Sequence, residues 1–288
     1  MLLNCAVLAL TVLSSSIVAS SQITLERLKW PIPALSSEWS SVDHSQLASL
    51  WATSEGNGSD DSSQTTPQSG RSGLIGRSIR RGLEDQKELY SIPFKRQNLK
   101  WDVLVLATTG ALIATDKHIE RQLPVVHYNS YNLLSDAALG TLSGSLVTMW
   151  AYGIKTDRPH LKETGELELE TLANTFLFYA PMQLIGARER PGEATNNGRF
   201  GHHHAFNTSF PGGHSMFTTA MATVLAHEYP KPWVEAAAYG AAAAVTAGRF
   251  IGRDHWASDL FVGNLLGYLI ASHIFHAHCD PELSDACH

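Results

Sequence analysis

Six apolar, alanine-rich segments follow one another from Trp101 to the end of this 288-residue chain, and they constrain its fold more than any other feature. Each has the length of a helix, and polar or Pro/Gly-containing connections separate them. Almost nothing between them alternates with the period of two that a strand requires. We therefore expect an all-α protein, a helical bundle of about six core helices, formed by residues 103–115, 137–154, 171–187, 215–227, 234–248 and 260–275.

The N-terminal hundred residues differ from this bundle. Residues 1–21 hold an apolar run followed by small residues, which predicts a secretory signal peptide and export to the periplasm or cell envelope. A single N-terminal anchor helix is the alternative. Residues 22–53 form a mixed N-terminal region, and residues 54–75, rich in Ser, Gly, Thr and Asp, predict a flexible linker in a partly disordered N-terminal region. Residues 76–100 are a basic connector, interpreted as a solvated surface, with contact to anionic lipid headgroups as the alternative.

The predicted functional domain is residues 101–278, with a C-terminal tail at residues 279–288. Several of its segments are apolar enough over 15–19 residues to span a thin bilayer. Ser, Thr, Asn and Gln are frequent within them, and Glu235 interrupts the fifth. We expect a compact bundle that associates with the envelope, and membrane integration stays open.

Charge and cysteine content exclude two classes of partner. The formal net charge is −6, whereas nucleic-acid binding usually needs a basic face, so no nucleic acid is expected. The chain has three cysteines. Cys5 would leave with the signal peptide, and Cys279 and Cys287 would pair in an oxidising compartment. They are too few and too close to the end of the chain to form a metal cage.

The candidate chemistry lies in three short clusters, and the last contains His255 and Asp259. If both residues lie on one helix, their spacing of four places them on the same face. A carboxylate there accepts the imidazole Nδ1 proton and leaves Nε2 as a nucleophile. Arg249, across a turn that contains Gly252, would reach a phosphate held in front of His255. Alone, such a pair is more often a structural hydrogen bond.

The two earlier clusters favour anion binding. Pro211-Gly212-Gly213-His214 precedes a predicted helix, whose free N–H groups and dipole attract phosphate, and His214 is placed to protonate a leaving oxygen. The first cluster runs from Gln183 to Pro191 and offers Arg188 and Arg190, whose guanidinium groups suit phosphate. Taken alone, a glycine-rich helix start with a surface histidine explains the second cluster equally well, and arginines at helix ends such as those of the first cluster are usually solvated.

Together the three clusters resemble the signature of the type 2 phosphatidic acid phosphatase and vanadium haloperoxidase superfamily. Its pattern is Lys-x6-Arg-Pro, Pro-Ser-Gly-His and Ser-Arg-x5-His-x3-Asp. The resemblance implies that His255 takes the phosphoryl group, that Asp259 orients it, and that His214 protonates the leaving group. It also implies that Arg190, Arg249 and the Gly213 amide bind the phosphate oxygens, without a metal or another cofactor.

Three positions depart from the pattern. Gln183 stands where the family has lysine, and Gly212 and Gly248 replace serines. We expect catalysis to survive with altered phosphate affinity or substrate preference, because the residues with catalytic roles are retained. Gln183 would remain beside the phosphate. Arg188 or Arg253 would supply the missing positive charge.

The resulting hypothesis is a metal-independent phosphatase acting on phosphomonoesters or pyrophosphates, plausibly lipid phosphates, through a phosphohistidine. A vanadate-dependent haloperoxidase is one alternative, which halide oxidation would reveal. A non-catalytic relative that only binds phosphate is the other, which a trapped phosphoprotein would exclude. The oligomeric state stays open.

Other polar motifs are interpreted as structural. Lys155 to Pro159 resembles the first cluster with the wrong spacing and predicts a helix cap. His202, His203 and His204 lack neighbouring carboxylates or cysteines at ligand spacing, so no metal site is predicted there. His273, His276 and His278 are interpreted as helix-face residues, and Asn207-Thr208-Ser209 matches a glycosylation acceptor.

Overall fold

The computed structural model describes residues 74–123, 128–193, 197–202, 208–284 and 286–287. In that part of the chain all regular structure is helical, which confirms the all-α prediction. The signal peptide, N-terminal region and most of the linker predicted before Leu74 lie outside the described residues. The helices are α3 (Leu74–Ser91), α4 (Leu99–Gln122), α5 (Tyr128–Lys155), α6 (Pro159–Gly186), α7 (Gly213–Glu228), α8 (Pro232–Ile251) and α9 (Ala257–His278), with short 3-10 turns at Ile92–Phe94 and Arg96–Asn98.

The six predicted segments are the cores of α4 to α9, and each helix extends beyond the apolar run. Prolines set two of the starts, because Pro159 and Pro232 occupy the first turns of α6 and α8. Arg158 is the N-cap residue of α6, as the interpretation of residues 155–159 as a helix cap requires. Ala187, with φ 38°, ends α6 in the left-handed region.

Helix α3 was not predicted, because its arginines suggested a solvated connector. Its inward face carries Asp85 and Leu89, which are four residues apart and buried, and so lie on one side of the helix. Gln86 also points inward and donates a hydrogen bond to Asn174 Oδ1 on α6 at 2.6 Å. The segment from residue 76 therefore joins the bundle instead of only leading to it.

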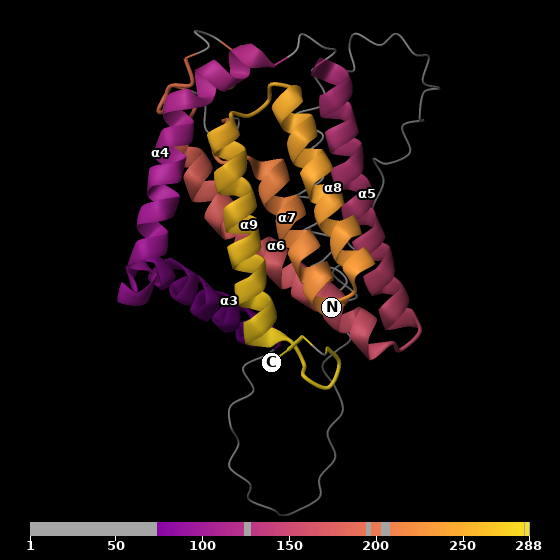
Figure 1. The fold of residues 1–288 in the computed structure, drawn as a ribbon. Helices are drawn as coiled ribbons and strands as arrows, with labels where there is room; N and C mark the ends of the chain where they lie inside the picture. The colour runs from indigo at the N-terminus through magenta and orange to yellow at the C-terminus, as the bar shows by residue number, and fades with distance from the viewer. Residues whose placement is uncertain (1–73, 124–127, 194–196, 203–207, 285, 288) are drawn as a thin grey trace, which may run out of the picture. The chain divides into compact units, whose positions relative to one another are not determined.

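Helix α7 is the central element, and α8 and α9 run beside it (Figure 1). Its residues Met216, Ala220 and Val224 are fully buried and pack in one cluster with Ile274 and Phe275 of α9. Burying a large aliphatic or aromatic side chain contributes roughly 1.5–3 kcal/mol relative to leaving it exposed. The core thus fixes α7 and α9 as a pair.

Glycines on α9 allow this pair to approach closely. A Cβ atom at Gly267 would lie 2.2 Å from Met216 O, and one at Gly263 would lie 2.5 Å from Gly212 O. Any larger residue would push the helices apart. The N-terminal ends of α7 and α9 are therefore held side by side.

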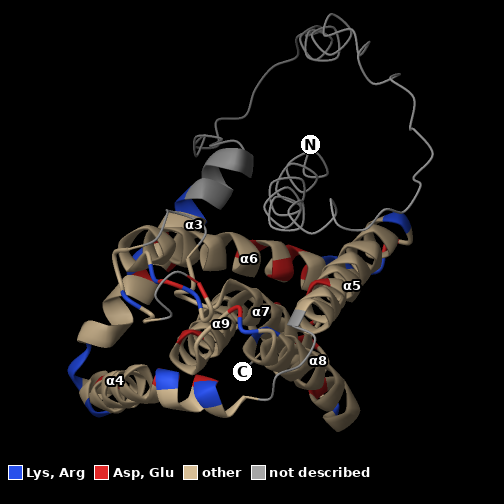
Figure 2. Ribbon diagram, turned by 90° about the horizontal axis from the view of Figure 1, so that it is seen from above, with Lys and Arg blue, Asp and Glu red and all other residues tan. Residues whose placement is uncertain are grey.

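Much of the outer surface is apolar, and Figure 2 shows long stretches of helix without charged residues. Helix α9 is the one described helix long and apolar enough to cross a membrane by length and composition, although 39% of its most apolar window is buried. Large apolar side chains are exposed on other helices, and this surface is compatible with membrane association. They include Trp101, Leu104 and Leu106 on α4, Leu133 and Leu134 on α5, and Leu184 and Ile185 on α6.

The C-terminal tail is tied to the bundle. Cys279 and Cys287 form a disulfide with a Cα–Cα distance of 5.8 Å, as the sequence predicted. It closes the tail into a loop directly after α9.

Candidate active site

The three sequence clusters meet where α6 and α8 end and where α7 and α9 begin. Gly212 N donates to Asp259 O at 3.0 Å, which joins the second and third clusters. Ser209 N donates to Arg188 O at 2.9 Å, which joins the loop before α7 to the first cluster. Figure 2 looks down on the bundle and shows blue and red ribbon segments at its centre beside α7 and α9. Residues up to 76 positions apart therefore share one site.

His255 lies in the short turn between α8 and α9 and is 5% exposed. Its Nδ1 lies 2.6 Å from the carbonyl oxygen of Ser209. A carbonyl can only accept, so Nδ1 carries the proton and Nε2 keeps its lone pair. Burial, together with the positive charge of Arg190, lowers the pKa of His255 to about 3. The imidazole is therefore neutral near pH 7, as a nitrogen nucleophile must be.

Asp259 does not accept the His255 proton, so the predicted direct contact is wrong. His255 precedes α9, whose N-cap is Trp256, and the two residues do not share a helix face. Asp259 is the third residue of the helix and accepts a hydrogen bond from Trp256 N at 2.9 Å. It also accepts a hydrogen bond from Ser209 Oγ. Asp259 therefore positions Ser209, and the carbonyl oxygen of Ser209 positions the His255 ring.

Burial dominates the ionisation of this carboxyl group. It raises the pKa of Asp259 to about 6, although Arg188 and the hydrogen bond from Ser209 act in the opposite direction. Arg188 pairs with the ionised form of the Asp259 carboxyl group.

Arg188 is not available to phosphate, so that prediction is also wrong. The residue is 2% exposed. Its Nη1 donates to Asp259 Oδ1 at 2.5 Å, and its Nη2 donates to Asp116 Oδ2 at 2.7 Å. The guanidinium also lies over the rings of Phe200 and Trp256. Arg188 is buried and links the end of α6 to α4 and α9.

Arg190 and Arg249 converge on Asp254. Arg190 Nη1 donates to Asp254 Oδ1 at 3.0 Å, and Arg249 Nη1 donates to Asp254 Oδ2. Burial acts to raise the pKa of Asp254, but the two arginines outweigh it and lower the value to about 2. Asp254 is therefore ionised and holds two guanidinium groups close to His255.

His214 lies on the first turn of α7, facing a carboxylate of α5 that the sequence did not reveal. Its Nε2 lies 2.9 Å from Asp136 Oδ1 and 2.5 Å from Arg249 Nη2. A single ring nitrogen either donates or accepts, so only one of these contacts is a hydrogen bond at a time. Burial lowers the pKa of His214 to about 4, although Asp254 acts to raise it.

Asp136 connects these groups. Its Oδ1 also accepts from Arg249 Nη2, and its side chain is 34% exposed. The carboxylate thus occupies the Nε2 of His214 and the Nη2 of Arg249 at the same time. The neighbouring Ser135 accepts from Arg249 Nε at 3.1 Å.

Gln183 shapes a loop and does not face a ligand, contrary to its predicted phosphate contact. It is 1% exposed. Its amide nitrogen donates to Phe210 O at 3.1 Å and to Pro211 O at 3.3 Å, and its oxygen accepts from Thr208 N at 3.2 Å. A lysine could donate to the same carbonyls but could not accept from Thr208. Gln183 therefore fixes the loop that leads into Gly213.

The glycines of the site are places of close approach. A Cβ atom at Gly213 would lie 2.8 Å from Tyr179 Cε2, and one at Gly212 would lie 2.8 Å from Ser215 Oγ. As the first residue of α7, Gly213 has an amide that no intrahelical carbonyl can satisfy. At Gly248, a Cβ would lie 3.1 Å from the Ser135 side chain, so glycine there lets α5 approach Arg249.

One of the residues missed by sequence reasoning has a recognisable signal. Asp136 is the sole acidic residue in α5, whereas Asp116 lies among the charged residues at the end of α4. A lone carboxylate in an apolar helix is costly unless it has a partner. Ser209 offered no such signal, because its backbone carbonyl makes the contact with His255, and every residue has such a carbonyl.

The remaining candidates lie away from this arrangement. Arg253, suggested as a replacement charge, donates to Glu120 and to Leu123 O. His202 is exposed and lies 2.7 Å from Phe200 O through Nδ1. His203, His204 and Asn207 lie outside the described residues.

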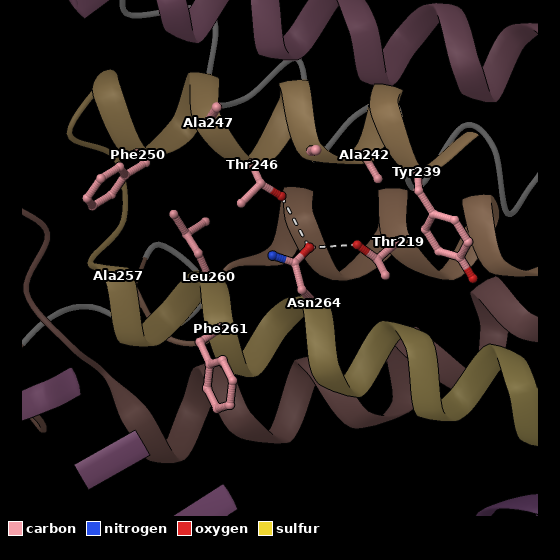
Figure 3. Close-up of a pocket in the computed structure, with 11 residues that line it drawn as sticks. Thr219, Tyr239, Ala242, Thr246, Ala247, Phe250, Ala257, Leu260, Phe261 and Asn264 are labelled. Atoms are coloured by element: carbon pink, nitrogen blue, oxygen red, sulfur yellow. Dashed lines mark hydrogen bonds between the residues drawn. The ribbon is translucent and has the colours of Figure 1, made fainter. Parts of the chain in front are cut away.

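An apolar groove of about 560 Å³ opens between α7, α8 and α9 (Figure 3). Its lining begins at Phe250, next to Arg249, and at Ala257, two residues after His255. A polar group interrupts it, because Asn264 Oδ1 accepts from Thr219 Oγ1 at 2.6 Å and from Thr246 Oγ1 at 3.2 Å. The other lining residues are Tyr239, Ala242, Ala243, Ala247, Leu260 and Phe261.

One comparison with known proteins agrees with the resemblance seen in the sequence. Residues 168–280 match a family model described as the PAP2 superfamily. The chain is also similar to the crystal structure of a transmembrane PAP2-type phosphatidylglycerolphosphate phosphatase from Bacillus subtilis, with 22% identity and a TM-score of 0.45. That similarity covers 60% of this chain and 92% of the other. No curated protein matches the chain.

Proposed function

Residues 168–280 place this chain in the PAP2 superfamily, and on that basis we propose that it is a metal-independent phosphatase that uses His255 as its nucleophile. The family supports a phosphatase-type activity. The nucleophile, the acid and the phosphate-binding residues are our assignment. Substrates are phosphomonoesters or pyrophosphates, with lipid phosphates the favoured class.

One observation carries this proposal: a neutral, oriented imidazole lies beside two arginines. Burial lowers the pKa of His255 most, and Arg190, Arg249 and His214 act in the same direction, because each lies near enough to repel a proton on its ring, while Asp254 opposes them. Cationic groups next to a nucleophile are suited to binding an anionic substrate and its developing charge. A purely structural histidine would not require two guanidinium groups beside it.

The reaction proceeds in two steps. The lone pair of His255 Nε2 bonds to phosphorus while the bond to the leaving oxygen breaks, and that oxygen takes a proton from His214 Nε2. His214 then accepts a proton from water as the water oxygen bonds to phosphorus and the nitrogen–phosphorus bond breaks. Inorganic phosphate leaves, and both imidazoles return to their starting states.

Arg190, Arg249 and the Gly213 amide supply the charge stabilisation. Two guanidiniums and a helix N-terminus can contact the three non-bridging oxygens of the transferred group. Asp259 is a positioning residue in this scheme, because it acts on His255 through Ser209.

Asp136 gives the site an unusual charge balance. Arg190 and Arg249 carry two positive charges, and Asp136 and Asp254 carry two negative ones. Apart from the proton that His214 must carry, a phosphate dianion therefore enters a group of four charges with no net positive charge. We propose that substrate displaces Asp136 from Arg249 and His214, so that Asp136 competes with phosphate.

The groove supports an apolar substrate. Its lining includes Phe250, which follows Arg249 in the sequence, and consists mainly of alanine, leucine and aromatic side chains. Burial of acyl carbons contributes about 0.8 kcal/mol for each CH₂ group. A phosphate ester with one short acyl chain fits this groove better than a sugar phosphate does.

The test is phosphate release by the purified full chain in excess EDTA, followed by quenching in alkaline detergent. We expect turnover without a metal, inhibition by vanadate, and an acid-labile phosphoprotein that is absent in His255→Ala. Turnover that EDTA abolishes would refute the mechanism. Phosphate binding without a phosphoprotein or turnover would leave a non-catalytic binding protein.

A further inference from the structure

Asp85, Glu170 and His278 form a cluster at the far end of α9 from the candidate active site. They belong to α3, α6 and α9, and one ligand atom from each lies within 4.8 Å of the others. Helix α9 has 22 residues, so at 1.5 Å per residue it separates the cluster from the His255 turn by roughly 33 Å. The sequence hid the cluster, because Asp85 and His278 are 193 residues apart.

The cluster has the dimensions of a metal site. His278 Nε2 lies 2.8 Å from Asp85 Oδ1 and 3.7 Å from Glu170 Oε1. Zinc bonds to imidazole and carboxylate ligands are about 2.0–2.2 Å long, so neighbouring ligands of a tetrahedral ion lie roughly 3.4 Å apart. The two observed distances bracket that value. A cation between the three groups requires only small side-chain movements.

Burial provides an independent indication. Asp85 is 4% exposed, and its Oδ2 has no hydrogen-bond partner among the described residues. A buried carboxylate oxygen without a partner is costly, and such atoms usually pair or coordinate a cation. The unsatisfied oxygen belongs to the same carboxylate that contacts His278. A bound cation would satisfy it.

Arg81 provides the positive charge when no metal is bound. Its Nε donates to His278 Nδ1 at 2.9 Å, and its Nη2 lies 3.2 Å from Glu170 Oε2. Metal binding at Nε2 moves the imidazole proton to Nδ1, where it would face the Arg81 N–H. Arg81 must then turn away. Its side chain is 48% exposed, so water can solvate it after it moves.

We propose that Asp85, Glu170 and His278 bind a divalent first-row transition metal, with Zn²⁺ as the test ion, and that this ion fastens α3 to α6 and α9. One imidazole and two carboxylates suit zinc, whereas magnesium and calcium favour ligand sets made only of oxygen. The site is structural and is independent of the proposed phosphatase mechanism.

The test is a titration of the EDTA-treated, buffer-exchanged full chain with Zn²⁺, read by calorimetry and by melting temperature. The wild type should bind one more equivalent than Asp85→Asn or His278→Ala. At free Zn²⁺ one hundred times the Kd, the folding equilibrium constant should rise about one-hundredfold. Arg81→Gln should bind Zn²⁺ about fivefold more tightly, because a nearby positive charge is removed.

His276→Ala is the matched control, because this exposed histidine on the last turn of α9 lies outside the cluster. It should bind Zn²⁺ as the wild type does. Equal stoichiometry and affinity in wild type, Asp85→Asn and His278→Ala would overturn the proposal, as would an absence of Zn²⁺ binding. Circular dichroism checks that each variant is folded. Phosphatase turnover should survive EDTA whichever result is found, so the two proposals fail separately.

Discussion

Two neighbouring arginines, Arg188 and Arg190, show how the same guanidinium group serves different purposes in two surroundings. Arg188 is 2% exposed and is surrounded by Asp116, Asp259, Ser258 and two aromatic rings. Arg190, two positions later, pairs with an aspartate whose side chain is 18% exposed. Helices enclose Arg188 and its partners, whereas Arg190 and Asp254 border the candidate site.

The difference teaches that surroundings, and not residue type, decide which guanidinium meets a ligand. Breaking a sealed ion pair leaves a charge buried without compensation, so its cost appears as lost stability. Breaking a pair beside a ligand site changes binding and turnover instead. Substitution of Arg188 should therefore lower the stability of the protein, whereas substitution of Arg190 should lower binding and turnover.

Removal of the buried charge of Arg188 gives the largest expected effect on stability. Arg188→Gln leaves Asp116 and Asp259 facing each other in a buried space, which should cost about 3–5 kcal/mol of unfolding free energy. At roughly 2–4 °C per kcal/mol for a domain of this size, the melting temperature should fall by about 10 °C. Thermal melting of the purified protein checks this. A loss of activity at unchanged melting temperature would contradict the structural role.

Arg190→Gln should show the reverse pattern. It removes one of two cations beside His255, and we expect kcat/KM to fall by about 10²-fold while the melting temperature changes little. Steady-state kinetics of Arg188→Gln, Arg190→Gln and wild type, measured together below the melting transitions, would test the comparison. Equal losses of stability in both variants would remove the distinction between Arg188 and Arg190.

The pH dependence should separate the two imidazoles. His255 must be neutral and its pKa is about 3, whereas His214 must be protonated and its pKa is about 4 in the free protein. Above pH 4 the protonated fraction of His214 falls, so kcat/KM should drop by up to tenfold per pH unit as pH rises. A pH–rate profile checks this. A rate that increases from pH 5 to pH 8 would exclude His214 as the acid.

Asp136→Asn should strengthen phosphate binding. The substitution removes a negative charge that contacts Arg249 and His214, and we expect the inhibition constant for inorganic phosphate to fall about tenfold. Glu235→Gln, on an exposed turn of α8, is the charge-matched control and should leave it unchanged. Weaker phosphate binding in Asp136→Asn would mean that Asp136 supports the site instead of competing within it.

The groove offers the smallest expected effect. Ala247→Phe places a ring in the groove, and it should raise KM for a short-chain phosphatidate about fivefold while leaving KM for glycerol phosphate unchanged. Ala244→Phe, also exposed on α8 but outside the groove lining, is the matched control. An equal rise for both substrates would place the acyl chain elsewhere.

The sequence predicted the helices and the location of the site better than the contacts within it. Apolar runs identify α4 to α9 because they are local signals. The direct His255–Asp259 contact failed because Trp256 caps α9 and places the two residues on different structural elements. Asp136, Asp116 and Ser209 come from distant segments, and only the packing of α4 and α5 brings the two carboxylates to the site.

Gly212 also limits how the family pattern can be restored. A serine at that position would place its Cβ against Ser215 Oγ, which itself donates to Gly212 O at 2.7 Å. A serine at position 212 therefore requires Ser215 to turn away and lose its hydrogen bond to Gly212 O, and the Asp259 carbonyl at 3.1 Å must shift slightly. Ser215→Ala would remove the first of these conflicts in advance, so the two positions are best redesigned together.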